Sequence, residues 1–216
     1  MQKKTKYSFI IGAILLTLFL IWTVLISLLD VQAVGPENSE VGFATVNGAF
    51  HKLTGVNMWM YDLSDLLSLI PLGIIGAFGL LGLVQWIKRK SFFKVDFNIL
   101  MLGAFYVIVM AFFVFFEIVE LNYRPILIEG VLEASYPSST TMLMMCVMPT
   151  AMMEFKRMIQ NKKIANVLII LSGIFTAVMV LFRLISGVHW LTDIIGGAFL
   201  SAGLVLLYKG VCELKK

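Results

Sequence analysis

The sequence predicts an all-α, polytopic membrane protein, a bundle of six transmembrane helices that forms a single domain over residues 1–216. Its composition is 60% hydrophobic and 14% charged, with a mean hydropathy of +0.94. Soluble domains usually carry about 25% charged residues. Two further observations support a membrane bundle: six apolar runs are long enough to cross a bilayer, and the basic residues cluster between alternate runs.

A transmembrane helix needs about 20 predominantly apolar residues. The runs that meet this length are residues 7–29, 66–87, 97–116, 134–153, 164–182 and 190–208. Lysines precede the first run, as in a signal peptide, but its 23 uncharged residues exceed the about 7–15 residues of a signal's apolar region. We therefore expect a retained anchor. The segment 31–64, with apolar residues such as Trp59, is expected to be an extracytoplasmic loop lying partly on the membrane interface.

The distribution of basic residues predicts the orientation. If the N-terminus is cytoplasmic, 14 of the 17 basic residues fall on the cytoplasmic side, in agreement with the positive-inside rule. These are Lys3, Lys4, Lys6, Lys88, Arg89, Lys90, Lys94, Lys156, Arg157, Lys162, Lys163, Lys209, Lys215 and Lys216. We expect a multi-pass protein of the cell membrane with both termini in the cytoplasm. The same clustering argues against a nucleic-acid partner.

Small residues predict where helices approach each other closely. Gly73, Gly76, Gly79 and Gly82 recur every three residues in the second run, and Gly196, Gly197 and Gly203 lie in the last run. In membranes, such residues let helix backbones pack tightly. The two cysteines, Cys146 and Cys212, lie in or near apolar segments and indicate neither a disulfide framework nor a metal site.

Ionisable side chains gather at the predicted extracytoplasmic end. His189 and Asp193 are four residues apart at a helix start and therefore share a face. A carboxylate can orient an imidazole and leave its other nitrogen free to attack. Arg124 and Arg183 fall at the same membrane face, and guanidinium groups suit phosphate oxygens.

A second feature that suits an oxyanion lies at the start of the fourth run, residues 134–153. Pro137 is expected in the first turn of a helix, so the amides of Ser138, Ser139 and Thr140 would be free helix-start donors. Each piece alone has an ordinary structural explanation, as a cap, an interface anchor or a headgroup contact. Their combination at one membrane face predicts a phosphate-binding site with a nucleophile.

Three motifs occur in a characteristic order: Asn122-Tyr123-Arg124-Pro125, then Tyr136-Pro137-Ser138-Ser139-Thr140, then Arg183 with His189 and Asp193 at fixed spacing. The chain thereby resembles the type 2 phosphatidic-acid phosphatase / haloperoxidase superfamily, in its six-span membrane branch. The resemblance implies that His189 is the nucleophile that forms a phosphohistidine and that Asp193 orients it. It also implies phosphate binding by Arg124, Arg183, Ser138 and the Ser139 amide, with no metal or other cofactor.

The motifs depart from the family pattern at two positions that carry chemistry. Glu117 stands where the first motif usually has a lysine, and Thr140 where the second has its acid histidine. A missing general acid typically costs about 10²–10⁴-fold in rate. Thr140 could instead relay a proton through water, and Glu117 could pair with an arginine or hold a cation. The variant motif favours a diphosphate substrate, whose leaving phosphate needs little protonation.

The sequence therefore predicts a membrane hydrolase that removes phosphate from a lipid phosphate or a polyprenyl diphosphate, with its site extracytoplasmic. Two alternatives stay open: a catalytically impaired relative that binds phosphorylated lipid as a sensor or scaffold, and a small transporter. Transporters usually place charged groups near the bilayer midplane, whereas those of this chain lie at the ends of the runs.

Overall fold

The computed structural model describes residues 3–215, and long helices dominate it. The long helices are α1 (Lys3–Leu28), α4 (Leu69–Arg89), α5 (Phe97–Ile118), α6 (Ser139–Met158), α7 (Lys162–Ile185) and α8 (Leu191–Leu214). The shorter elements are β1 (Gln32–Ala33), η1 (Pro36–Asn38), β2 (Glu40–Val41), α2 (Ala44–Thr54), α3 (Met58–Leu67) and η2 (Phe92–Lys94). The predicted all-α membrane fold is confirmed.

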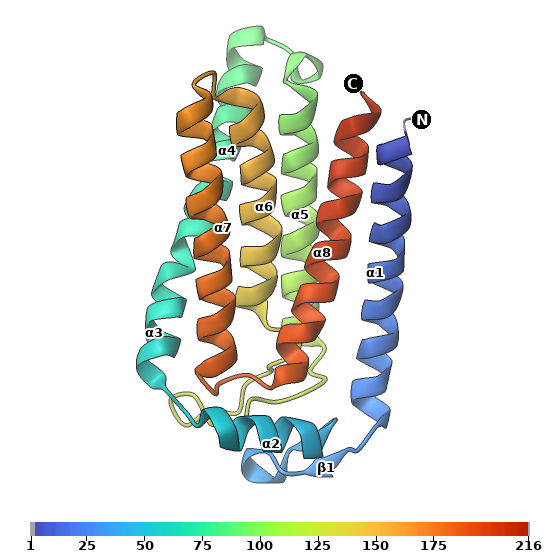
Figure 1. The fold of residues 1–216 in the computed structure, drawn as a ribbon, viewed down its shortest axis with the longest axis vertical. Helices are drawn as coiled ribbons and strands as arrows, with labels where there is room; N and C mark the ends of the chain where they lie inside the picture. The colour runs from blue at the N-terminus through green and yellow to red at the C-terminus, as the bar shows by residue number, and fades with distance from the viewer. Residues whose placement is uncertain (1–2, 216) are drawn as a thin grey trace.

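The long helices run side by side along the molecule, and α2 lies across one end of the bundle (Figure 1). Both chain termini lie at the opposite end. Five helical stretches of the described residues are long and apolar enough to span a membrane: Lys3–Leu28, Met58–Arg89, Phe97–Ile118, Lys162–Ile185 and Leu191–Leu214. The second stretch combines α3 and α4.

Helix α6 accounts for the difference between these five stretches and the six predicted runs. It packs against α7 and α8 within the bundle, and 11 of its 20 residues, from Thr140 to Glu154, are buried. Ser139, three threonines and Glu154 lower its hydropathy. A helix shielded by other helices does not need an apolar outer face. Its crossing of the membrane stays a prediction.

Glycines make the close contact between α1 and α8. A Cβ on Gly12 would lie 3.1 Å from the carbonyl oxygen of Gly203, and a Cβ on Gly203 would lie 3.2 Å from that of Gly12. A Cβ on Gly196 would lie 2.4 Å from the Tyr136 ring. The prediction that small residues of the last run permit tight packing is therefore confirmed.

The same prediction is wrong for most of α4. A Cβ on Gly73, Gly76 or Gly79 would meet no atom within 4 Å, whereas one on Gly82 would lie 3.3 Å from Ile99. These glycines therefore do not bring α4 close to another helix within the described structure. Three-residue spacing alone could not distinguish a packed face from an open one.

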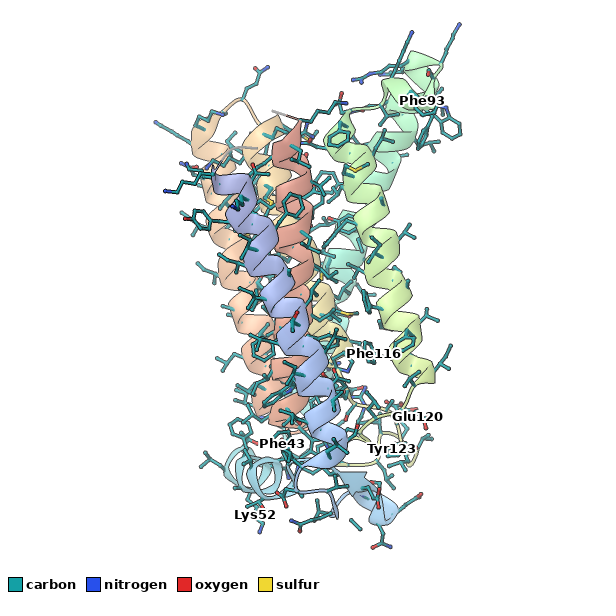
Figure 2. All side chains as sticks on the ribbon, turned by 90° about the vertical axis from the view of Figure 1, so that its right-hand side faces the viewer. Phe43, Lys52, Phe93, Phe116, Glu120 and Tyr123 are labelled. Atoms are coloured by element: carbon teal, nitrogen blue, oxygen red, sulfur yellow. The ribbon has the colours of Figure 1, made fainter. Side chains whose placement is uncertain are left out.

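The segment 31–64 is more ordered than a plain loop. It contains the hairpin of β1 and β2, the whole of α2 and the first turns of α3. Figure 2 shows Phe43 and Lys52 from this segment at the same end as Glu120 and Tyr123 from the loop after α5. Buried Asn47 joins α2 to α8, because its Nδ2 donates to the Thr192 hydroxyl at 2.9 Å. The segment closes one end of the bundle.

The predicted run 134–153 begins too early. Residues 134–138 are loop, and α6 begins at Ser139 with Ser138 as its N-cap. Pro137 therefore precedes the cap and does not occupy the first helical turn. The Ser138 side chain accepts a hydrogen bond from the Thr141 amide, and this capping bond satisfies one of the helix-start donors.

Candidate functional site

Two connecting segments form the candidate site at the end of the bundle that α2 covers. One is the loop between α5 and α6, which carries Arg124, and the other is the short turn between α7 and α8, which carries His189. The segments are joined directly, because the Trp190 indole donates to the Tyr123 carbonyl oxygen at 2.7 Å. All three sequence motifs therefore meet at one end of the molecule.

Arg183 is held in a buried position in the last turn of α7. Its side chain is only 2% exposed. Its Nη1 donates to the Ser64 hydroxyl at 3.3 Å, and its Nη2 lies 3.7 Å from Oδ1 of Asp65. Its Cζ lies 4.9 Å from the centre of the Tyr61 ring, within cation–π range. The Nε atom has no hydrogen-bond partner and is buried.

Arg124 approaches the same aromatic ring from the loop after α5. Its Cζ lies 5.7 Å from the Tyr61 ring centre, and its Nε lies 3.0 Å from Oε2 of Glu133. The Arg124 amide also donates to the Glu133 carbonyl oxygen at 3.0 Å. The two residues are therefore joined by both a backbone and a side-chain contact. Nη1 of Arg124 is buried without a hydrogen-bond partner. The tyrosine thus places the two predicted phosphate-binding cations near each other.

The imidazole of His189 is buried and oriented by a backbone carbonyl group. Its Nδ1 lies 3.2 Å from the Ser135 carbonyl oxygen, which can only accept a hydrogen bond. Nδ1 must therefore carry the proton, and in the neutral ring Nε2 keeps its lone pair. Nε2 is buried and has no hydrogen-bond partner. This is the protonation pattern that a nucleophilic histidine requires.

The surroundings also keep this ring neutral. His189 lies in the turn between α7 and α8, outside both helices. Burial lowers the pKa of His189 well below its ordinary value of 6.5, and the positive charges of Arg124 and Arg183 lower it further. The hydrogen bond to Ser135 opposes these effects but does not outweigh them. Near neutral pH the imidazole is therefore uncharged, with its one proton on Nδ1.

Asp193 is buried beside the ring. Its Oδ2 lies 3.7 Å from Nδ1 of His189 and accepts a hydrogen bond from the Trp190 amide at 2.9 Å, which caps α8. Its Oδ1 has no hydrogen-bond partner. The carboxylate therefore lies close enough to stabilise a positively charged imidazole, while the carbonyl of Ser135 makes the hydrogen bond.

The second motif supplies less than the sequence suggested. Ser138 is fully buried, and its amide donates to the Asp193 carbonyl oxygen at 3.1 Å, so the expectation that this amide is free is wrong. Ser139 is half-buried and lines the pocket beside His189. Thr140 is buried in the first turn of α6 and is not among the residues that line this pocket.

A small pocket opens beside His189. Glu117 lines it from the last turn of α5, together with Ser135 and Ser139, and phenylalanines of α5 form an apolar wall. Glu117 makes no ion pair with the described residues, and Arg124 instead pairs with Glu133. Within residues 3–215, no group of three or more His, Cys, Asp or Glu side chains is arranged to hold a metal ion.

Sequence reasoning missed the residues that support the arginines and the catalytic turn. Tyr61, Ser64 and Asp65 lie on one face of α3, and all three contact or face Arg183. Their spacing of three and four residues was a usable signal, but nothing in the sequence links α3 to α7. The need for glycine at position 187 (φ +70°) could not be predicted from the sequence either. A Cβ there would lie 1.9 Å from the carbonyl oxygen of Gly55, which is distant in the chain.

The arrangement can bind a tetrahedral oxyanion and attack it. Two arginines that each keep a buried donor atom without a partner lie near enough to His189 to lower its pKa, and the lone pair of this neutral histidine is free. Buried cationic donors without partners are costly unless a ligand satisfies them. A phosphoryl group offers both the oxygens for the guanidinium groups and the phosphorus for the imidazole.

A solved membrane protein has a similar fold. The chain is similar to the crystal structure of the first transmembrane PAP2 type phosphatidylglycerolphosphate phosphatase from Bacillus subtilis, with a TM-score of 0.62 and 20% sequence identity over 95% of this chain and 97% of that chain. This likeness supports a common fold. No curated protein matches this chain in sequence.

The family comparison covers the part of the chain that carries the motifs. Residues 116–213 match the sequence model of the PAP2 superfamily. The matched part includes Arg124, Ser138, Arg183, His189 and Asp193, which the sequence motifs had singled out. The match confirms the predicted resemblance to this superfamily over residues 116–213, from the end of α5 through most of α8.

Proposed function

We propose that this protein is an integral membrane phosphatase that removes the terminal phosphate of a lipid phosphate or lipid diphosphate through a phosphohistidine intermediate. One observation carries the proposal: the free Nε2 of a neutral, buried His189 lies in a site with two arginines, each of which keeps a buried donor atom without a partner. The PAP2 superfamily match over residues 116–213 supports the same reaction class.

The reaction has two steps. Nε2 of His189 attacks phosphorus, a nitrogen–phosphorus bond forms, and the bond from phosphorus to the leaving oxygen breaks. Arg124 and Arg183 bind the phosphoryl oxygens, and Asp193 stabilises the ring while it carries positive charge. Water then attacks the phosphohistidine, so inorganic phosphate leaves and the neutral imidazole is restored.

The absence of a histidine at position 140 favours a good leaving group. An alcohol, with a pKa near that of water at about 15.7, leaves poorly unless it is protonated. A phosphate leaves readily, because its second pKa is about 6. We therefore infer that a lipid diphosphate, such as a polyprenyl diphosphate, is turned over faster than a phosphate monoester of a similar lipid.

The proposed reaction takes place at the extracytoplasmic face. The site lies at the opposite end of the bundle from both termini (Figure 1), and the clusters of basic residues assign the termini to the cytoplasm. A cysteine introduced at exposed Lys52, beside the site, is expected to react with a membrane-impermeant maleimide in whole cells. A cysteine at Lys90 serves as the opposite-face control, and the reverse labelling pattern would contradict this topology.

The reaction is tested with purified protein and matched lipids. The panel contains farnesyl diphosphate, farnesyl phosphate and a phosphatidylglycerolphosphate, the last because the similar solved structure is named for it. We expect phosphate release from the wild type to be fastest with the diphosphate and to be lost in His189→Ala. A stopped reaction should trap an acid-labile phosphate on the wild type only. Equal rates with matched mono- and diphosphates would contradict the leaving-group argument.

A catalytically impaired relative that binds phosphorylated lipid is the second candidate. Thr140 and Glu117 favour it, since neither can supply the acid or the cation that the family motif usually provides. Binding of farnesyl diphosphate to wild type and to Arg183→Gln separates the candidates. Arginine-dependent binding without phosphate release, by a protein with a native melting temperature, would establish the binding role and exclude the enzyme.

A further inference from the structure

A large apolar groove lies between α4 and α5, away from the candidate site. Its volume is about 730 Å³, and its lining includes Phe78, Gly79 and Trp86 of α4 with Gly103, Val107 and Met110 of α5. Pockets of about 300–1,000 Å³ hold small ligands in proteins. The pocket beside His189 is lined from α5 by other residues, Phe112 to Glu117, nearer the opposite end of that helix.

Glycines produce this hollow. A Cβ on Gly79 or on Gly103 would meet no atom within 4 Å, so larger side chains would fit the helices but would fill the space. Gly82 also lines the groove. Gly79, which does not serve helix packing, and Gly103 therefore leave room for an apolar occupant.

The groove ends at a basic rim. Lys88 and Lys90 at the end of α4 and Lys94 in η2 are exposed, and within the described residues none of them has an ion-pair partner. Trp86 and Phe92 line the groove next to this rim and are about half exposed. Figure 2 shows Phe93, from the same turn, at the end of the molecule opposite Tyr123. Tryptophans such as Trp86 are enriched at the level of lipid headgroups.

We propose that this groove binds an anionic phospholipid of the membrane leaflet at this end, with an acyl chain between α4 and α5 and the headgroup at Lys88, Lys90 and Lys94. Charge complementarity selects this occupant. An apolar groove that ends at unpaired lysines matches a molecule with an apolar tail and an anionic head. A zwitterionic lipid offers the same tail but no net charge to the rim.

The proposal is tested by quenching of tryptophan fluorescence. The protein is reconstituted in phosphatidylcholine vesicles with rising fractions of phosphatidylglycerol whose acyl chains carry bromine, and the signal of Trp86 is the difference between wild type and Trp86→Phe. Each basic residue near an anionic lipid contributes about a fivefold preference. We therefore expect half-maximal quenching at an at least tenfold lower fraction of brominated phosphatidylglycerol than of brominated phosphatidylcholine.

Matched variants test the headgroup contact and the acyl-chain contact separately. The triple variant Lys88→Gln, Lys90→Gln, Lys94→Gln should lose the preference, whereas Lys156→Gln, Lys162→Gln, Lys163→Gln, three exposed lysines outside the groove, should keep it. Gly79→Leu with Gly103→Leu should abolish saturable quenching, and Gly73→Leu with Gly76→Leu, which face open space outside the groove, should not. Equal quenching by both brominated lipids, or none by either because a protein covers the groove, would overturn the proposal.

Discussion

The carbonyl oxygen of Ser135 and Nδ1 of His189 are joined by a hydrogen bond of 3.2 Å. This bond connects the segment before the second motif with the centre of the third. It fixes the ring orientation and directs the unprotonated Nε2 away from Ser135. Asp193, 3.7 Å from the same Nδ1, therefore does not have to fix the tautomer.

We expect Asp193→Asn to retain measurable activity. In a serine-protease triad, the corresponding change costs about 10⁴-fold in kcat because the histidine takes the wrong tautomer, and here we expect only about 10–100-fold. An asparagine oxygen can still cap the Trp190 amide. The measurement is the kcat of Asp193→Asn, compared with the kcat of the wild type and of His189→Ala. A folded Asp193→Asn protein as inactive as His189→Ala would show that the carboxylate, and not Ser135, controls the ring.

Asp65 should compete with substrate for Arg183. Its carboxylate lies 3.7 Å from Nη2 of Arg183 and is 60% exposed. Exposed ion pairs contribute about 0–1 kcal/mol, so Asp65→Asn should tighten inhibition by inorganic phosphate by up to about fivefold. Asp62→Asn is the matched control, because Asp62 is exposed on the same helix and has no ion pair with described residues. Equal effects of both variants would indicate a general charge effect and contradict a specific pair.

Activity should persist below the ordinary pKa of histidine. Because burial and two guanidinium groups lower the pKa of His189 below 6.5, the neutral imidazole survives as the pH falls through 6.5. The acidic limb of kcat/KM should therefore lie below that pH. Arg124→Gln removes a positive charge, so the pKa should rise and the limb should move to higher pH.

This shift is read from the ratio of the variant's kcat/KM to that of the wild type, in which the ionisation of the substrate cancels. Lys52→Gln is the control, because it removes a positive charge at the end of α2 that is not among the charges lowering the pKa of His189. This variant should leave the acidic limb in place. An unchanged limb in Arg124→Gln would mean that this arginine does not face the imidazole.

Gly187→Ala should damage both stability and activity. A residue other than glycine at φ +70° costs about 1–3 kcal/mol, and its Cβ would lie 1.9 Å from the Gly55 carbonyl oxygen. The turn that carries His189 would have to move away from the segment after α2. Thermal unfolding in detergent and kcat are the measurements. Gly173→Ala, which faces open space on α7, should be neutral or stabilising, and equal losses in both variants would contradict this account.

Hydropathy and motif spacing were enough to predict the membrane fold, most helix positions and the chemical groups of the site. Hydropathy decides these features locally, because each lipid-facing helix must be apolar along its own length. Arg183, His189 and Asp193 are also close in the sequence, in the last turn of α7, the turn that follows and the first turn of α8. Helix α6 departs from this rule, because burial by other helices permits its polar residues.

The surroundings of these groups depend on contacts between segments that are distant in the chain. Tyr61 lies beneath both arginines, Ser135 orients His189, and Gly187 meets Gly55, although these partners are far apart in the sequence. Three-residue spacing could not show that Gly79 borders an open groove and that Gly73 and Gly76 face no other helix. Such relationships depend on how separate helices dock, which is a property of pairs of surfaces and is not encoded in the pattern of either one alone.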